Sequence, residues 1–345
     1  MTAFPPWSIA HNRTIGGDHT FVIAEVGSNH DQNLDLAFES IDAAAEAGAD
    51  AVKFQSLQMD KLYFDPPEDV RELYDKIDLE EEWHSKLKRR CDEQGVIFFT
   101  SPTYLDAVDL LQSLEVPLFK LASAQVGTFP QLVDRVAAQE KPTLLSTGLV
   151  SYGELERAVE SFRRHGNDRF VILHCNSIYP TPFERVHLPL MQTYQEMFDC
   201  PVGFSDHTDD IFAPLGAVAR GAAVIEKHFT LSRNLSTPDA SIAIEPDAFE
   251  RMVEGIRAVE KTLTPAVRTD IESEEENFKE SVRYRLVLDV AKSTGDEFNP
   301  EDFRFLRHDQ GVDCRDVERV VDRMQANKSL SKGDLLRWSH LEGKQ

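Results

Sequence analysis

From residue 21 to about residue 260, short runs of β-branched and aromatic residues alternate with amphipathic stretches rich in Ala and Glu. The apolar runs have the length of single strands, and the stretches between them have the length of helices. Eight such repeats over roughly 250 residues predict an α/β fold of the (β/α)8 TIM-barrel type. A doubly wound open sheet is the alternative, but it normally has fewer strands, and no GxGxxG follows the first run. The runs are FVIAEVG, AVKFQ, VIFFTSP, FKLAS, PTLLSTG, FVILHCN, PVGFSDH and AAVIEKHFT.

A change of composition marks the end of this repeating part. Residues 1–261 are expected to form the barrel, and residues 262–280 read as a polar, acidic connector. Residues 281–345 contain Gly-Asp turns in STGDEFNPEDF and in LSKGDLLRWSHL, which predict a small β-rich module. A module of this size is expected to need a partner surface for stability.

The composition excludes several classes of function. With 60 acidic and 37 basic residues the net charge is −23, and no basic patch is present, so neither nucleic acid nor an anionic membrane surface is an expected partner. No apolar run approaches the ~20 residues of a membrane span, and the first residues lack signal-peptide features, which favours a cytoplasmic protein. The four cysteines show no CxxC spacing and predict neither a disulfide framework nor a thiolate zinc site.

The predicted strands share an unusual inner face. Each run starts apolar and ends polar, and in a barrel of this type the functional groups lie at the C-terminal ends of the strands. Because alternate strand residues share a face, a set of polar side chains can point into one barrel, and burying them is costly unless they bind something. These residues are Glu25, Lys53, Gln55, Lys120, Ser205, His207, Glu226 and His228.

Two histidines, His207 and His228, end neighbouring runs. An imidazole pair with open positions for water and substrate suits Mn, Fe, Co or Zn, with Mg less suited to nitrogen ligands. The alternative for each is a hydrogen-bonded core histidine. The nearby Glu226 and Asp206 favour the metal site.

Two lysines, Lys53 and Lys120, lie on the same predicted face. They could be salt-bridge partners of Glu25 or Glu226, but two buried ammonium groups would demand more than one carboxylate, and a phosphate or carboxylate ligand would satisfy both. Serine hydroxyls at the strand ends could add neutral donors: Ser101, Ser123 and Ser205.

Several other positions have an ordinary structural explanation as strong as a functional one. Asn29 and His30 could cap the following helix, Tyr179 could pack against neighbouring prolines, and Asp239 could shape a turn. The STG at residues 146–148 is interpreted as a turn.

These strings resemble the sialic acid synthase family. The resemblance rests on IAEVGSNH, AGADAVKFQ, FKLAS, LLSTG, HCNSIYPTP, VGFSDHT and GAAVIEKHFTL, in order, over nearly the whole chain. It implies condensation of phosphoenolpyruvate with an N-acetylated hexose, N-acetylmannosamine or a related bacterial amino sugar, to a nonulosonic acid. It also implies a divalent metal (Mn2+, with Mg2+ or Co2+ as alternatives), a C-terminal antifreeze-like domain (SAF, β-clip) and a domain-swapped homodimer.

The resemblance also implies roles for individual residues. Phosphoenolpyruvate would be held by Lys53, Lys120, Ser101, Ser123 and Ser205, with Ser177 as a further contact. His207 and His228 would ligate the metal, and Glu25 would orient or deprotonate water. The sugar would be faced by Gln55, Tyr179 and Asp239, and Arg307 of the partner subunit would reach its acyl group.

Three departures from the family pattern concern the acceptor and the tail. Gln125 stands where the family commonly has an acidic residue, residues 237–240 read Thr-Pro-Asp-Ala in place of Gly-Pro-Asp-His, and residues 306–309 read Leu-Arg-His-Asp in place of Lys-Arg-Pro-Gly. Gln125 and residues 237–240 both lie near the sugar site that the resemblance implies, so the identity of the acceptor is less defined than the reaction type. Another phosphoenolpyruvate-dependent barrel synthase or aldolase, or a non-catalytic sugar-binding relative, is the alternative.

Overall fold

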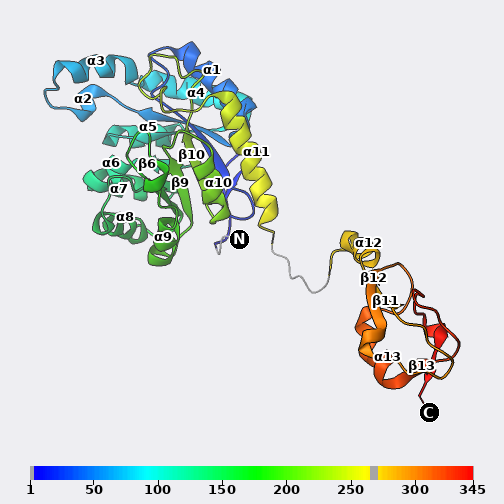
Figure 1. Cartoon of the computed structure of the whole chain (residues 1–345). Helices are drawn as coiled ribbons and strands as arrows, with labels where there is room; N and C mark the ends of the chain where they lie inside the picture. Colours follow the sequence, from blue (N-terminus) through cyan, green and yellow to red (C-terminus); the bar gives the residue numbers. More distant parts are fainter. Residues whose placement is uncertain (1–3, 265–270, 345) are drawn as a thin grey trace. The chain divides into compact units, whose positions relative to one another are not determined.

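The computed structural model describes residues 4–264 and 271–344. The chain forms two compact units, Met1–Thr264 and Pro265–Gln345 (Figure 1). Residues 265–270 of the predicted connector lie outside the described residues, whereas its last part forms helix α12 (Ser273–Ser281). No helix within the described ranges has both the length and the apolar character of a bilayer span.

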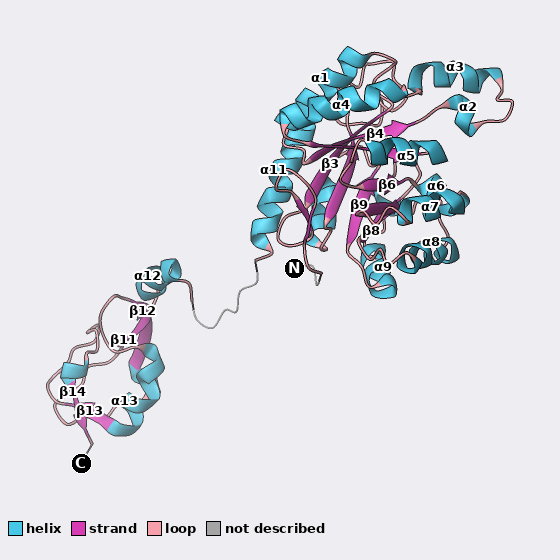
Figure 2. Ribbon diagram, turned by 180° about the vertical axis from the view of Figure 1, so that it is seen from behind, coloured by secondary structure: helices cyan, strands magenta, loops and turns pink. Residues whose placement is uncertain are grey.

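The first unit is a barrel of eight parallel strands, as the repeats predict (Figure 2). The strands pair in the order β5-β4-β3-β10-β9-β8-β7-β6, and β5 lies beside β6, so neighbours in sequence are neighbours around the barrel. This order excludes the doubly wound alternative. The strands are β3 (Phe21–Gly27), β4 (Ala51–Ser56), β5 (Ile97–Pro102), β6 (Phe119–Leu121), β7 (Thr143–Ser146), β8 (Phe170–Cys175), β9 (Val202–Asp206) and β10 (Val224–His228).

Helices surround the strands, and local signals set their ends. The α8 helix starts with a capping box between Ser151 and Glu154, and α4 ends at Gly95 in the left-handed conformation. Asn33 caps α1 by accepting hydrogen bonds from two backbone N–H groups, so of the two interpretations left open for Asn29 and His30, the capping one is excluded. The helices are α1 (Leu34–Glu46), α2 (Met59–Leu62), α3 (Glu68–Ile77), α4 (Glu81–Gln94), α5 (Leu105–Ser113), α6 (Ser123–Thr128), α7 (Pro130–Ala137), α8 (Tyr152–Arg164), α9 (Leu190–Phe198), α10 (Phe212–Ala219) and α11 (Pro246–Thr262), with a 3-10 turn η1 (Phe183–Arg185).

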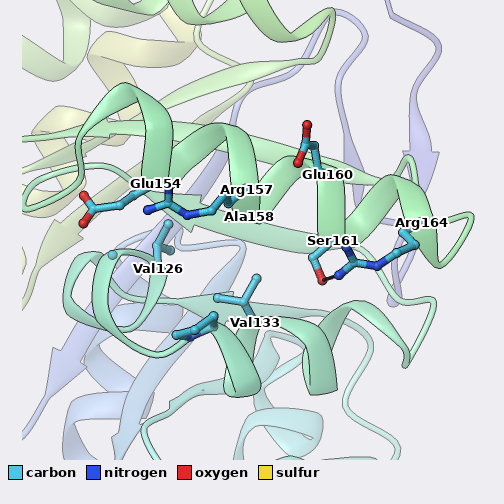
Figure 3. A pocket seen from close by; sticks show the side chains of 10 residues that line it. Val126, Val133, Glu154, Arg157, Ala158, Glu160, Ser161 and Arg164 are labelled. Carbon is cyan, nitrogen blue, oxygen red and sulfur yellow. Dashed lines mark hydrogen bonds between the residues drawn. The ribbon is translucent and has the colours of Figure 1, made fainter.

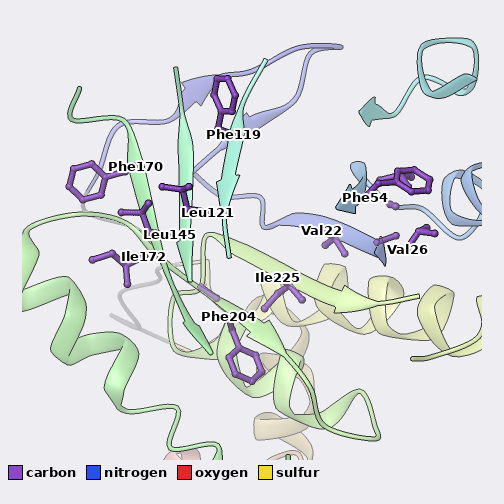
Figure 4. Close-up of a cluster of buried hydrophobic side chains, with 14 of the residues drawn as sticks. Val22, Val26, Phe54, Phe119, Leu121, Leu145, Phe170, Ile172, Phe204 and Ile225 are labelled. Carbon is purple, nitrogen blue, oxygen red and sulfur yellow. The ribbon is translucent and has the colours of Figure 1, made fainter. Parts of the chain in front are cut away.

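The outward faces of the strands and the inward faces of the helices form one apolar layer. Phe54, Leu121, Ile172 and Phe204 belong to it, and Figure 4 shows them on their strands. Burial of this layer supplies the main driving force for closing the barrel, at roughly 25 cal/mol per Å2 of apolar surface.

The inward faces change character along the strands. At the N-terminal end they are apolar, with Phe21, Ile23 and Phe99 in one buried cluster, and a hairpin of β1 (Trp7–Ser8) and β2 (Thr14–Ile15) packs against this cluster. Two residues further along the same face, the side chains become polar. The barrel therefore has an apolar floor beneath a polar layer at the C-terminal ends of its strands.

The second unit is small and β-rich. Strand β11 (Tyr284–Leu288) pairs with β12 (Phe303–Arg307), and β13 (Met324–Ala326) pairs with β14 (Leu341–Gly343). Both Gly-Asp turns noted in the sequence close in the same way, with the Asp side chain accepting from a serine N–H three residues earlier at 2.7 Å. The remaining elements are α13 (Val317–Arg323), η2 (Pro300–Asp302), η3 (Cys314–Asp316) and η4 (Trp338–His340).

Candidate active site

A cavity of about 290 Å3 opens at the C-terminal ends of the barrel strands. Asp239 lies beside it, and Arg307 belongs to the second unit. The cavity brings together the other predicted site residues: Glu25, Lys53, Gln55, Ser101, Lys120, Ser123, Gln125, Ser177, Tyr179, Ser205, His207 and His228. It is further lined by Leu57, Thr103, Ala122, Ala124, Ser146, Leu149, Cys175 and Glu226.

Four buried ionisable groups form the deepest polar layer of the cavity, which we call the charge quartet: Lys53, Lys120, Glu25 and Glu226. Lys53 Nζ lies 2.7 Å from Glu25 Oε2 and 3.7 Å from Glu226 Oε2. Lys120 Nζ donates to Glu226 Oε1 at 3.1 Å. Both predicted lysines thus have carboxylate partners, and two positive and two negative charges balance without a ligand.

Burial and ion pairing act against each other within the quartet. Burial lowers the pKa of Lys120, and Glu226 only partly offsets this effect. For Lys53, burial is outweighed by the two carboxylates, which raise its pKa. Burial would also raise the pKa of Glu226, but the two ammonium groups and a hydrogen bond from Ser205 lower it overall, so Glu226 is an ionised acceptor between the lysines.

The predicted serines surround this layer in different ways. Ser101 Oγ accepts from Lys53 Nζ at 3.3 Å, and Ser205 Oγ donates to Glu226 Oε1 at 2.9 Å. Ser123 Oγ accepts from the backbone N–H of Gly148 at 2.9 Å. A Cβ at Gly148 would overlap Ser177 Oγ, so a larger residue here would displace the Ser177 side chain from its position in the cavity wall.

Ser146 is a lining residue that the sequence analysis missed, because STG was interpreted as a turn. It ends β7, and its buried Oγ has no hydrogen-bond partner within the described residues. The signal that could have found it is the strand alternation, since Leu144 belongs to the apolar floor and Ser146 is the next residue on that face. Ser146 therefore offers a further hydroxyl donor to a ligand.

His207 and His228 lie side by side, with ring centroids 5.2 Å apart. His207 Nδ1 is 2.6 Å from the carbonyl oxygen of Asn176, and because a carbonyl can only accept, Nδ1 carries the proton and Nε2 keeps its lone pair. Burial, reinforced by the neighbouring His228, lowers the pKa of His207 to about 3. His207 is therefore a neutral imidazole with one nitrogen oriented by the backbone.

This pair fits a divalent ion with a partly open coordination sphere. His228 Nδ1 is buried without a hydrogen-bond partner in the part of the chain that the structure describes, and it lies 3.7 Å from Asp239 Oδ2. No group of three or more His, Cys, Asp or Glu side chains able to hold a metal occurs among the described residues. Two imidazoles would leave the remaining positions to water and substrate, as the sequence analysis expects.

The predicted sugar-facing residues gather around the histidines. The Tyr179 ring lies 4.2 Å from that of His207, so it packs on the histidine and lines the cavity. Gln55 Nε2 donates to Glu25 Oε1 at 2.9 Å. A Cβ at Gly27, where φ is +58°, would come within 3.2 Å of Asp239 Oδ2 and 3.3 Å of Glu25 Oε1, so this glycine lets the two carboxylates face one space.

Asn29 holds the segment that carries Asp239, a role that the sequence analysis missed. Its Oδ1 accepts from Thr237 Oγ1 at 2.8 Å and from Asp239 N at 3.2 Å, while its Nδ2 donates to the Phe229 carbonyl at 3.0 Å. Asp239 is therefore held by the turn that follows β3 as well as by its own loop.

Arg307 is exposed on β12 of the second unit, and its guanidinium lies 5.4 Å from the centroid of the Tyr284 ring. The two residues are directly opposite each other in the β11–β12 register. This stacking limits the conformations of the Arg307 side chain in the described unit.

A second cavity of about 310 Å3 lies among α6, α7 and α8 (Figure 3). Its lining combines Glu154 and Glu160 with Arg157 and Arg164, and it contains none of the predicted site residues. The two glutamates and two arginines in its lining balance in charge, and none of the four residues of the charge quartet lines it.

The sequence and the fold of this chain both match those of known proteins. A model of the NeuB family matches residues 40–268. An uncharacterized protein of Methanocaldococcus jannaschii is 36% identical over 96% of this chain and 98% of its own length. The N,N'-diacetyllegionaminic acid synthase of Campylobacter jejuni is 33% identical over 92% of this chain and 99% of its own length. The crystal structure of an N-acetylneuraminic acid synthetase from Leptospira borgpetersenii, in complex with citrate, has a TM-score of 0.73 and 31% identity, covering 80% of this chain and 95% of that chain.

Proposed function

Because the chain belongs to the NeuB family, a family of sialic acid synthase-like enzymes, we propose that it condenses phosphoenolpyruvate with an N-acetylated hexose. The products are a nonulosonic acid and inorganic phosphate. The observation that carries the proposal is that two buried lysines, Lys53 and Lys120, line the same cavity as the His207 and His228 pair. An anion site beside a metal site suits a reaction in which an anionic donor attacks a carbonyl that a metal polarises.

In this proposal Lys53 and Lys120 bind the phosphate and carboxylate of phosphoenolpyruvate. Ion pairs with Glu25 and Glu226 already fix the positions of both lysine side chains. The side chains therefore need to move little when the anion binds. Neutral donors complete the anion site: Ser101, Ser123, Ser146, Ser177 and Ser205.

His207 and His228 would hold the divalent ion, with Mn2+ preferred and Mg2+ or Co2+ as alternatives. When bound there, the ion would polarise the aldehyde oxygen of the acceptor. The hydrogen bond from His207 Nδ1 to Asn176 orients the ring for this role.

The reaction joins C3 of phosphoenolpyruvate to the aldehyde carbon, and a water oxygen adds to C2. The bond between C2 and the phosphate oxygen then breaks, and phosphate leaves with the bridging oxygen and with the proton of the C2 hydroxyl, which becomes a ketone. The proton taken from water passes to the former aldehyde oxygen, which becomes a hydroxyl. Glu25 orients the water and takes its proton, because its carboxylate lies at the cavity floor with one oxygen held by Gln55 Nε2. Lys53 and Lys120 hold the departing phosphate.

The charge distribution supports an acceptor without phosphate. Among the described lining residues, the lysines of the charge quartet are the cations, and both are taken up by phosphoenolpyruvate in this mechanism. Gln125 can donate to or accept from a sugar hydroxyl but cannot act as a base. We therefore propose N-acetylmannosamine or a related bacterial amino sugar, faced by Gln55, Tyr179 and Asp239.

Arg307 is proposed to reach the acyl group of the acceptor from the partner subunit of a domain-swapped homodimer. The support is its exposed position on β12 and its stacking on Tyr284, which leaves the guanidinium edge free to donate.

The test is phosphate release from phosphoenolpyruvate by the purified, metal-loaded protein. Phosphate is expected only when an amino-hexose is added, and Lys120→Met should abolish the signal, whereas Lys61→Met, at an exposed lysine outside the cavity, should not. A panel should include N-acetylmannosamine, its 6-phosphate and a diacetamido hexose. Sugar binding without phosphate release would indicate a non-catalytic relative, and preference for the 6-phosphate would overturn the inference from the charges.

A further inference from the structure

Lys227 lies between two residues of the cavity and points away from it. Glu226 and His228 line the cavity, so by strand alternation Lys227 faces the apolar layer between the sheet and the helices. Its neighbours on that face, Ile225 and Phe229, are fully buried members of the layer. The Lys227 side chain is 0% exposed, an unusual place for an ammonium group.

Within the described residues, the hydrogen-bond partners of this ammonium group all lie in residues 206–210, a short segment that begins with the last residue of β9. Lys227 Nζ donates to Asp206 Oδ2 at 2.6 Å, to the carbonyl of Thr208, and to the carbonyl of Asp210 at 3.1 Å. Asp206 in turn accepts from Thr208 N at 2.9 Å and from Thr208 Oγ1 at 3.0 Å. The three donors of the ammonium group are used, and the segment is closed into a compact loop.

The residue inside this loop is His207. Its two neighbours in sequence, Asp206 and Thr208, are both held by Lys227, and its own carbonyl accepts from Thr181 N at 2.8 Å. With the Nδ1 hydrogen bond to Asn176, both the backbone and the ring of His207 are fixed.

Stability alone does not account for such an ion pair. Removing two charges from water costs several kcal/mol per ion, and well-packed apolar residues of similar volume often serve stability as well or better. What an apolar pair cannot do is bind two backbone carbonyls at defined positions. The pair therefore has a geometric role.

We infer that Lys227 is a positioning residue that sets the direction of His207 toward the bound metal. The inference rests on the proposed function for the identity of the metal site, but the orientation of His207 can be measured without it. Lys227 touches neither substrate nor metal and acts through the loop of residues 206–210.

The experiment compares two double variants that remove the ion pair without leaving an unpaired charge. Lys227→Met with Asp206→Leu removes both charges and their hydrogen bonds, whereas Lys227→Gln with Asp206→Asn keeps neutral donors and acceptors and remains testable if the first does not fold. The matched control is Lys292→Met with Asp302→Leu, which removes a 2.6 Å ion pair in the second unit.

Equilibrium dialysis of the metal-free proteins against Mn2+ should show ~10- to 100-fold weaker binding in both double variants, with about unchanged affinity for phosphoenolpyruvate and no change in the control. Nitrogen-15 NMR of the metal-free wild type should show a His207 Nδ1–H signal that shifts or is lost in the variants. Wild-type Mn2+ affinity in a folded double variant would overturn the inference. Failure of the wild type to bind Mn2+ would instead overturn the proposed metal site, and an unchanged His207 signal in the variants would then overturn the inference independently.

Discussion

Replacing Lys120 by Met tests the anion site most directly, because it disturbs the charge balance of the quartet. In the wild type the charges of Lys53, Lys120, Glu25 and Glu226 cancel. Without Lys120 the quartet has a net charge of −1, and the Glu226 carboxylate keeps only Lys53 at 3.7 Å and the hydroxyl of Ser205. The incoming ligand is itself an anion, so it loses a partner and meets a repelling charge.

Two effects set the magnitude. A charge-assisted hydrogen bond contributes about 1.5–3 kcal/mol. An uncompensated carboxylate ~5 Å from the ligand adds about 3 kcal/mol of repulsion at an effective dielectric constant of ~20, which proton uptake by Glu226 would reduce. We therefore expect the affinity of the Lys120→Met variant for phosphoenolpyruvate to fall by at least about 2 kcal/mol, roughly 30-fold.

A second variant separates the two effects. Lys120→Met combined with Glu226→Gln returns the quartet to zero net charge, so it should remove the repulsion and leave only the loss of the hydrogen bond. The assay is calorimetric titration of the folded, metal-free proteins with phosphoenolpyruvate, and Lys61→Met serves as the control. An unchanged dissociation constant in the single variant, or a double variant that binds no better than the single one, would refute this reasoning.

Three further outcomes are expected. Chelation of divalent metal, and likewise His207→Ala or His228→Ala, should lower turnover by orders of magnitude, and both substitutions should lower the bound metal; full turnover in a metal-free preparation would contradict the metal site. The Arg307→Ala and His207→Ala variants should each be nearly inactive. When they are refolded together, half of the dimers are hybrids with one intact site, so the mixture should regain about one quarter of wild-type activity. If subunits exchange but the activity is no greater than the sum of the two variants, Arg307 acts in its own subunit's site or in none. Hydrogen bonds from Ser161, and from Arg164 and His165, lower the pKa of Asp134 to about 2, so its contribution to stability should be present above about pH 4 and be lost as the pH falls through 2. Asp134→Asn should therefore lower the melting temperature at pH 6 and have little effect on it at pH 2. An equal decrease in melting temperature at both pH values would contradict the predicted pH dependence of stability.

The barrel could be predicted because its signal is repeated. Each strand has one face in the apolar layer, and the alternation that places Phe21 and Ile23 in the floor also places Glu25 above them. The same periodicity carries Lys53 and His228 to the cavity. The inward position of these side chains follows from backbone geometry, which local sequence determines well.

What the sequence could not supply depends on contacts between distant segments. The position of Ser146 in the wall follows from the exact end of β7, and strand ends are the least predictable part of an element. The Glu226 carboxylate forms ion pairs with both Lys53 and Lys120, and this arrangement depends on the side-chain rotamers of residues on β4, β6 and β10. Asn33 caps α1 because the helix begins at Leu34, and Asn29 instead contacts the loop that carries Asp239, 210 residues away in sequence.

The hairpin of β1 and β2 bears on the order in which the proposed substrates bind and the products leave. It packs against the buried cluster that contains Phe21 at the N-terminal end of the barrel, whereas the cavity opens at the opposite end, so on the proposed function reactants would enter from that side. The lysines lie at the bottom of this cavity and the histidines nearer its mouth, because Lys53 precedes Gln55 on β4 and His228 is the last residue of β10. A sugar seated first would block the way to the anion site. Binding should therefore be sequential, with phosphoenolpyruvate entering before the acceptor and phosphate departing only after the sugar acid has cleared the entrance.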